Sequence, residues 1–121
     1  MKRFSKRRAA EVGEIGYMKI RSGDHRVVHV WVVVVEDRVM VRSWNDKPGG
    51  WYRAFLKHPH GAILVGDNEV AVRAVPVVSA KWIDAASDAY ALKYDTKANL
   101  KYVKGFRAAR RRATTLELIP T

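Results

Sequence analysis

The sequence predicts a mainly β protein: one small antiparallel barrel of six short strands with helices around it. The chain has 121 residues, which is enough for one domain with a core and too few for two. Short runs of β-branched and aromatic residues alternate with turns that contain Gly, Asp or Pro. Two pairs of these runs are separated by only two turn residues. Such hairpins favour antiparallel pairing, and six short strands are enough to close a small barrel.

The first half of the chain predicts three strands and a helix. Residues 14–21 form a first strand, and Ser22, Gly23 and Asp24 supply the turn after it. Residues 25–35 form the longest strand, and a tight reversal leads into a strand over residues 38–44. The Pro- and Gly-containing stretch after it is a loop, from which a short helix over residues 50–57 begins.

The strand over residues 25–35 is apolar on both of its faces. Val28, Val30 and Val32 share one face, while Trp31 and Val33 share the other. An antiparallel strand with one face in water alternates apolar with polar residues, so this strand must be covered twice. Either a helix or another subunit provides the second cover. We therefore expect a homodimer.

The second half predicts another hairpin, a long helix and a closing strand. Strands over residues 60–65 and 68–77 flank Gly66-Asp67, a dipeptide suited to a turn with positive φ at its first residue. Ser79 is a candidate N-cap for a helix over residues 80–94. A less regular segment at 97–112 follows, and residues 113–119 form the last strand.

The net charge of +11 belongs to two segments and not to the whole chain. Residues 1–12 form a basic arm, and residues 13–121 form the barrel domain. Outside the clusters at 1–8 and 104–112, 13 basic residues face 12 acidic ones. The clusters allow a nucleic-acid-associated protein as a third hypothesis, although a groove-reading surface should carry cations on the domain itself. A phosphate-bearing ligand is an equally reasonable target.

Composition and motifs exclude several classes of chemistry. The chain has no cysteine, which rules out disulfides, thiol nucleophiles and thiolate metal sites. No metal site is predicted from its four histidines, because no carboxylate lies at a ligand spacing from them. No nucleophile elbow or phosphate loop is present. No signal-peptide or membrane-spanning run occurs, so we expect a cytoplasmic protein without a membrane partner.

Ser-Gly-x-x-Arg at 22–26, the hairpin after it, and Trp51 followed by Pro59 resemble the split-barrel flavin and deazaflavin oxidoreductases. The resemblance implies a six-stranded split β-barrel of the FMN-binding type. It also implies that the turn holds the cofactor's phosphate, while the strand at 39–43 and the Trp-led helix border the isoalloxazine ring. On that match the cofactor-binding residues are Arg21, Ser22, Gly23, Arg26, Arg42, Ser43 and Trp51.

Two residues depart from this pattern. Asp24 stands where the deazaflavin enzymes commonly carry a lysine, and Ala54 stands where the helix usually presents an asparagine. An acid beside a phosphate is unfavourable, so a deazaflavin coenzyme is a weaker candidate than FMN. These departures favour the rival hypothesis, a cofactor-free binding or structural module with the same fold.

A longer resemblance covers almost the whole chain. Val-x-Val-Trp-Val-Val-Val at 28–34, Gly-Gly-Trp-Tyr-Arg at 49–53 and Thr-Thr-Leu-Glu-Leu-x-Pro at 114–120 look like an uncharacterised bacterial family. That family is grouped with the split-barrel (pyridoxamine phosphate oxidase-like) flavoproteins and has no established activity. The leading hypothesis is thus a homodimeric FMN-binding protein, with hydride or electron transfer to a small organic substrate as its activity.

Overall fold

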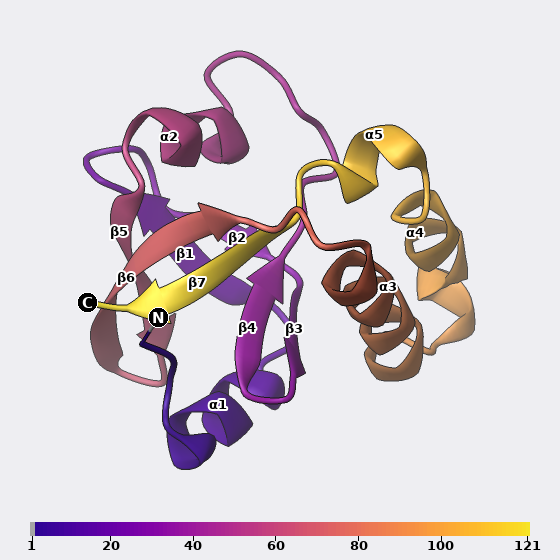
Figure 1. Cartoon of the computed structure of the whole chain (residues 1–121), viewed down its shortest axis with the longest axis horizontal. Helices are drawn as coiled ribbons and strands as arrows, with labels where there is room; N and C mark the ends of the chain where they lie inside the picture. Colours follow the sequence, from indigo (N-terminus) through magenta and orange to yellow (C-terminus); the bar gives the residue numbers. More distant parts are fainter. Residues whose placement is uncertain (1) are drawn as a thin grey trace.

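The computed structural model describes residues 2–121 and places seven strands and six helical segments in them. The predicted mainly β architecture is confirmed: an antiparallel barrel-like sheet with helices around it (Figure 1). The strands are β1 (Met18–Ser22), β2 (Val28–Val30), β3 (Val32–Val35), β4 (Arg38–Val41), β5 (His60–Val65), β6 (Asn68–Pro76) and β7 (Leu116–Pro120). The helical segments are α1 (Lys6–Gly13), α2 (Trp51–Lys57), α3 (Ala80–Lys93), η1 (Lys97–Asn99), α4 (Leu100–Gly105) and α5 (Ala109–Arg112).

The sheet has the strand order β2-β1-β5-β6-β7-β4-β3, and every pairing in it is antiparallel. Its two edge strands, β2 and β3, are separated in the chain by Trp31 alone. The sheet therefore curls around until its edges meet end to end, and the barrel is nearly closed. Its interior is filled by its own mostly aliphatic side chains, so a ligand has to lie outside it.

The strand expected over residues 25–35 is divided in two at Trp31, which gives seven strands where the sequence predicts six. β2 pairs with β1, and β3 pairs with β4 on the other side of the barrel. The alternation of faces survives this break. Val30 and Val32 point into the barrel core, whereas Val33 joins a second cluster outside it.

A helix of the same chain covers that outer face. Val33 and Met40 pack against Tyr90 of α3 and Tyr94, the residue that caps its C-terminal end, and all four side chains are buried. The sequence allows either a helix or another subunit to cover this second apolar face. In the structure, a helix of the same chain covers it. The strand no longer gives a reason to expect a second subunit, and the homodimer stays a prediction.

The predicted basic arm is folded onto the barrel. Phe4, Ala9 and Val12 are buried and belong to the barrel core, as does Phe55 of α2. Helices α1 and α2 lie at opposite ends of the barrel (Figure 1). Arg3 adds an ion pair to the nearly buried Glu117 of β7. Met1, the first residue of the arm, lies outside the described residues.

Both hairpins follow the predicted turn chemistry. Gly66 adopts the expected positive φ between β5 and β6. The expected tight reversal between β3 and β4 is also present, and there Glu36 and Asp37 adopt positive φ, which the sequence did not predict. Helix α3 begins after Ser79 as expected, although the Ser79 side chain makes no capping hydrogen bond. In the described part of the chain, no helix combines the length and apolar character needed to cross a membrane.

Candidate functional site: an aromatic pocket beside the barrel

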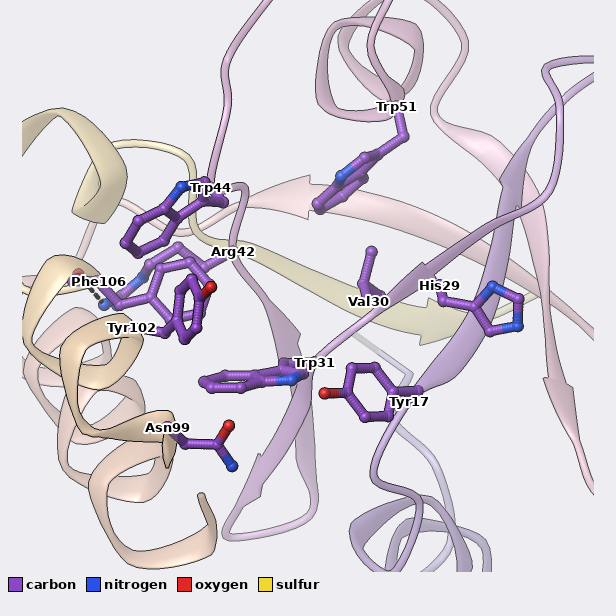
Figure 2. Close-up of a pocket in the computed structure, with 10 residues that line it drawn as sticks. All are labelled: Tyr17, His29, Val30, Trp31, Arg42, Trp44, Trp51, Asn99, Tyr102 and Phe106. Atoms are coloured by element: carbon purple, nitrogen blue, oxygen red, sulfur yellow. Dashed lines mark hydrogen bonds between the residues drawn. The ribbon is translucent and has the colours of Figure 1, made fainter. Parts of the chain in front are cut away.

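A pocket of about 340 Å³ opens between the barrel wall and helix α4, and aromatic side chains form most of its walls. We call it the aromatic pocket. Figure 2 shows Trp51 across the opening from Trp31, with Trp44 and Tyr102 on the α4 side and the His29 ring directed away from the centre. Its walls thus combine residues far apart in sequence: Tyr17, His29, Val30, Trp31, Arg42, Trp44, Trp51, Asn99, Tyr102 and Phe106.

Trp31 is held in place by the end of α3. Its ring stacks on Tyr94 with centroids 4.0 Å apart and an interplanar angle of 5°. The Tyr94 hydroxyl donates to Gly16 O at 2.6 Å and accepts from Val32 N at 3.0 Å, which satisfies backbone groups beside the strand break. Burial raises the pKa of Tyr94 to about 12, so this hydroxyl stays protonated at neutral pH.

Lys93 supports the same break. Its Nζ donates to Ile15 O and Val32 O at 2.6 Å each. Burial lowers the pKa of this ammonium to about 8. Lys93 therefore connects β3, at the residue after Trp31, to the segment before β1.

Trp44 is packed between the pocket and the basic C-terminal segment. The guanidinium carbon of Arg111 lies 3.5 Å from the centre of the Trp44 ring, and Arg111 Nε donates to Trp44 O. A Cβ on Gly105 would meet the same ring at 2.3 Å, so only glycine allows α4 this close. Tyr102 meets Trp44 edge-on at 5.2 Å between centroids. The position of this wall thus depends on α4 and α5.

Arg42 lies behind the aromatic wall with only 2% of its surface exposed. Its guanidinium donates to the hydroxyls of Thr115 and Ser87 and to the carbonyls of Phe106 and Ile83, at 2.8–3.0 Å. None of these partners is a carboxylate. Burial lowers the pKa of Arg42, the direction expected for a cation removed from water.

The predicted phosphate turn lies at a second hollow of about 650 Å³, which we call the turn hollow. Ser22 and Gly23 line it, together with residues of α2. Their donors are already used within the protein: Ser22 Oγ donates to His58 O at 2.7 Å, and Gly23 N donates to His60 O at 2.9 Å. Arg21 donates to Gly23 O and pairs with Glu69.

The seven predicted cofactor-binding residues are not gathered at one place. Arg42 and Trp51 line the aromatic pocket, whereas Ser22 and Gly23 line the turn hollow, and α2 contributes residues to both. Arg26 is exposed and contacts Gly49 O and His25. Ser43 is buried and donates to Asn45 O. Their roles in cofactor binding stay predictions.

The aromatic pocket contains residues that sequence reasoning missed: Tyr17, Trp31 and Tyr102. The sequence pattern indicates only an apolar strand face at Trp31, and Tyr102 falls in the segment at 97–112 for which it predicts no regular element. One signal was present, since Trp31 is the largest side chain on the outer face of the valine strand. Its neighbours across the pocket depend on tertiary packing.

The two basic segments are only partly available to a partner. Arg107 pairs with Asp88, Arg112 pairs with Asp84, and Arg111 is stacked on Trp44. In Figure 1 α1, from the first segment, and α5, from the second, lie at opposite ends of the molecule. Binding of nucleic acid by these segments stays a prediction.

Fold and site together define a small antiparallel barrel with an aromatic pocket on its outer wall. Residues 8–118 match the model of a family described as uncharacterized proteins conserved in bacteria (DUF2255), and the chain belongs to this family. A search of curated proteins finds no match.

Proposed function

We propose that the protein is a small-molecule-binding barrel and that the aromatic pocket takes a flat aromatic ligand. The observation that carries the proposal is the convergence of Trp31, Trp44, Trp51 and Tyr102 on one open pocket. Aromatic faces that border a cavity offer stacking and apolar contact to a planar ring. Small-molecule sites are typically concave, apolar clefts of this size with a few polar groups.

A flavin ring is the first ligand to test, because the sequence resembles the FMN-binding split barrels. The aromatic pocket suits the ring of such a cofactor. The predicted phosphate cradle does not fit, because the donors of Ser22, Gly23 and Arg21 already serve the protein's own acceptors. A bound flavin would supply hydride or electron transfer, which is the activity that the resemblance implies.

The occupied donors of the phosphate turn favour a second candidate function, the cofactor-free binding module. Internally satisfied donors at the turn, together with Asp24 and Ala54, are what a barrel without a phosphate site would show. Such a module would use the aromatic pocket for a ligand that carries no phosphate. Riboflavin and FMN, which differ only by a phosphate, distinguish these two candidates.

Calorimetric titration with both ligands tests the proposal. We expect FMN to bind at most about tenfold more tightly than riboflavin, and Trp51→Ala to weaken both by about tenfold through the lost stacking face. Trp82→Ala is the matched control, because Trp82 lies on α3 beneath Arg38 and does not line the pocket.

Two results would change this account. An affinity for FMN that is a hundredfold or so above that for riboflavin would restore the phosphate cradle, since charge-assisted bonds to phosphate are strong. Failure of riboflavin, FMN and simple indoles to bind at all would overturn the proposed function.

A further inference from the structure

Cations border the aromatic pocket: one lines it, and two others lie against aromatic rings of its walls. Arg42 lies buried beneath Trp44 and Phe106 (Figure 2), and Arg111 covers the Trp44 ring. Lys101 Nζ lies 5.0 Å from the centre of the Tyr102 ring. These groups decide which charge a ligand in the pocket can carry.

Within the described residues, no carboxylate is in contact with the Arg42 guanidinium. Its four hydrogen-bond partners are two hydroxyls and two carbonyls, which are neutral. Asp84 attracts the Arg42 cation without touching it, but Asp84 pairs with Arg112, and the charges of Arg112 and Arg107 oppose that attraction. Buried charges in proteins are ordinarily paired, and a contacting carboxylate would largely cancel the field of Arg42. Because none is in contact, the positive field of Arg42 extends into the pocket that this residue lines.

Arg111 acts on the pocket through the Trp44 ring. Trp44 lines the aromatic pocket and also a separate hollow. Arg111 lines that second hollow, together with Ser43 and Asp46, and is not among the residues that line the aromatic pocket. The guanidinium therefore occupies the ring face away from the aromatic pocket. A cation on one face uses the negative π density of the ring and weakens the attraction of the other face for a second cation.

The residues that line the pocket also disfavour a cationic ligand. None of the ten residues that line the pocket is acidic, and one of them is the buried Arg42. An aromatic pocket for a cationic ligand would need its ring faces free and no buried cation beside them. The charges thus exclude an ammonium ligand and leave neutral or anionic ones.

We propose that the aromatic pocket selects a flat aromatic ligand that carries a negative charge, such as an aromatic carboxylate. This inference rests on the proposed function and names its ligand class. It assigns a specificity role to Arg111, which acts through Trp44, and to the buried charge of Arg42.

Three compounds that share the indole ring system and differ in charge test the selection: indole-3-acetate is an anion, indole-3-acetamide is neutral and tryptamine is a cation. We expect affinity to fall in that order, with a ratio of at least about tenfold between the anion and the cation, and with the ratio reduced by added salt. Trp51→Ala should weaken all three probes to a similar degree, which places their binding in the pocket.

Arg111→Gln should reduce the anion-to-cation ratio by about threefold. Arg110→Gln is the matched control, because it removes the same net charge from the neighbouring position without uncovering Trp44. Arg111→Lys keeps the charge and should retain part of the preference. If both glutamine variants lower the ratio equally, the selection comes from net charge and the role of Arg111 is refuted.

The outcomes separate this inference from the proposed function. Binding of all three indoles with equal affinity, or with tryptamine tightest, overturns charge selection and leaves an aromatic-ligand site. Binding of none of the three, together with none of the flavins, overturns the proposed function itself.

Discussion

The barrel interior and the layer between its outer wall and helices α3 and α4 are built from different chemistry. Inside, mostly aliphatic side chains such as Ile63 and Leu118 fill the space. Outside, Val33 and Met40 meet Tyr90, Tyr94 and Phe106, and a buried arginine lies among them. The aromatic pocket borders the outer layer. The interior provides the stability of the fold, whereas the outer layer holds polar and aromatic groups in positions that a ligand can use.

The largest expected effect is at Arg42, the buried cation of the outer layer. Arg42→Met removes the donor to the buried Phe106 carbonyl and to the hydroxyls of Ser87 and Thr115. It should lower the free energy of unfolding by about 3–5 kcal/mol, because each buried acceptor left unsatisfied costs about 1–3 kcal/mol. Urea denaturation measures it. Arg53→Met, which removes an exposed arginine paired with Asp46, should change little. Equal effects in the two variants would contradict the structural role of Arg42.

Gly105→Ala should disturb the pocket more than the fold. The new methyl group would meet the Trp44 ring and displace it, at a cost of about 1–3 kcal/mol. Indole affinity should fall at the same time. Gly16→Ala is the control, since nothing lies within 4 Å of a Cβ at Gly16. Retained ligand affinity in Gly105→Ala would show that the position of Trp44 is not critical.

Removing the Tyr94 hydroxyl tests how the strand break is held. Tyr94→Phe leaves Gly16 O and the buried Val32 N without their side-chain partner, which should cost about 1–3 kcal/mol. Ile63→Val in the barrel interior should cost about 0.5–1.5 kcal/mol and leave ligand affinity unchanged. If Tyr94→Phe also left affinity unchanged, Trp31 would be positioned by packing alone.

The smallest expected effect concerns Lys93 and depends on pH. Its pKa is about 8 in the folded protein against 10.5 as the ordinary value, so the unfolded chain binds more protons between these limits. Stability should therefore rise with pH from about pH 8 until the tyrosines of the unfolded chain begin to ionise near pH 10. Lys93→Met should lack this rise. A flat wild-type profile in urea denaturation would contradict the burial of the ammonium.

Local patterns predicted the hairpins and the long helix well. Gly66-Asp67 marks its turn because glycine tolerates the positive φ, and the α3 region carries an apolar stripe of helical period. The break at Trp31 could not be predicted, because valines on both faces of residues 25–35 predict one continuous strand. Helix α1 was hidden by its basic composition, although Ala9 and Val12 lie three residues apart on one helical face.

The candidate site was less predictable than the fold. Trp51 was assigned to a ligand site by resemblance, and it lines the aromatic pocket. The environment of Arg42 depends on partners 41–73 residues away in the chain, which no local pattern contains. The same holds for Tyr102, which reaches the pocket only because α4 packs against α3.

The tryptophans give the most direct test of the aromatic pocket as a ligand site. The chain has four, of which Trp31, Trp44 and Trp51 line the pocket and Trp82 does not. In NMR spectra of the indole N–H groups, added indole-3-acetate should shift the signals of these three and leave that of Trp82 unchanged. A shift confined to Trp82, or no shift at ligand saturation, would contradict the account.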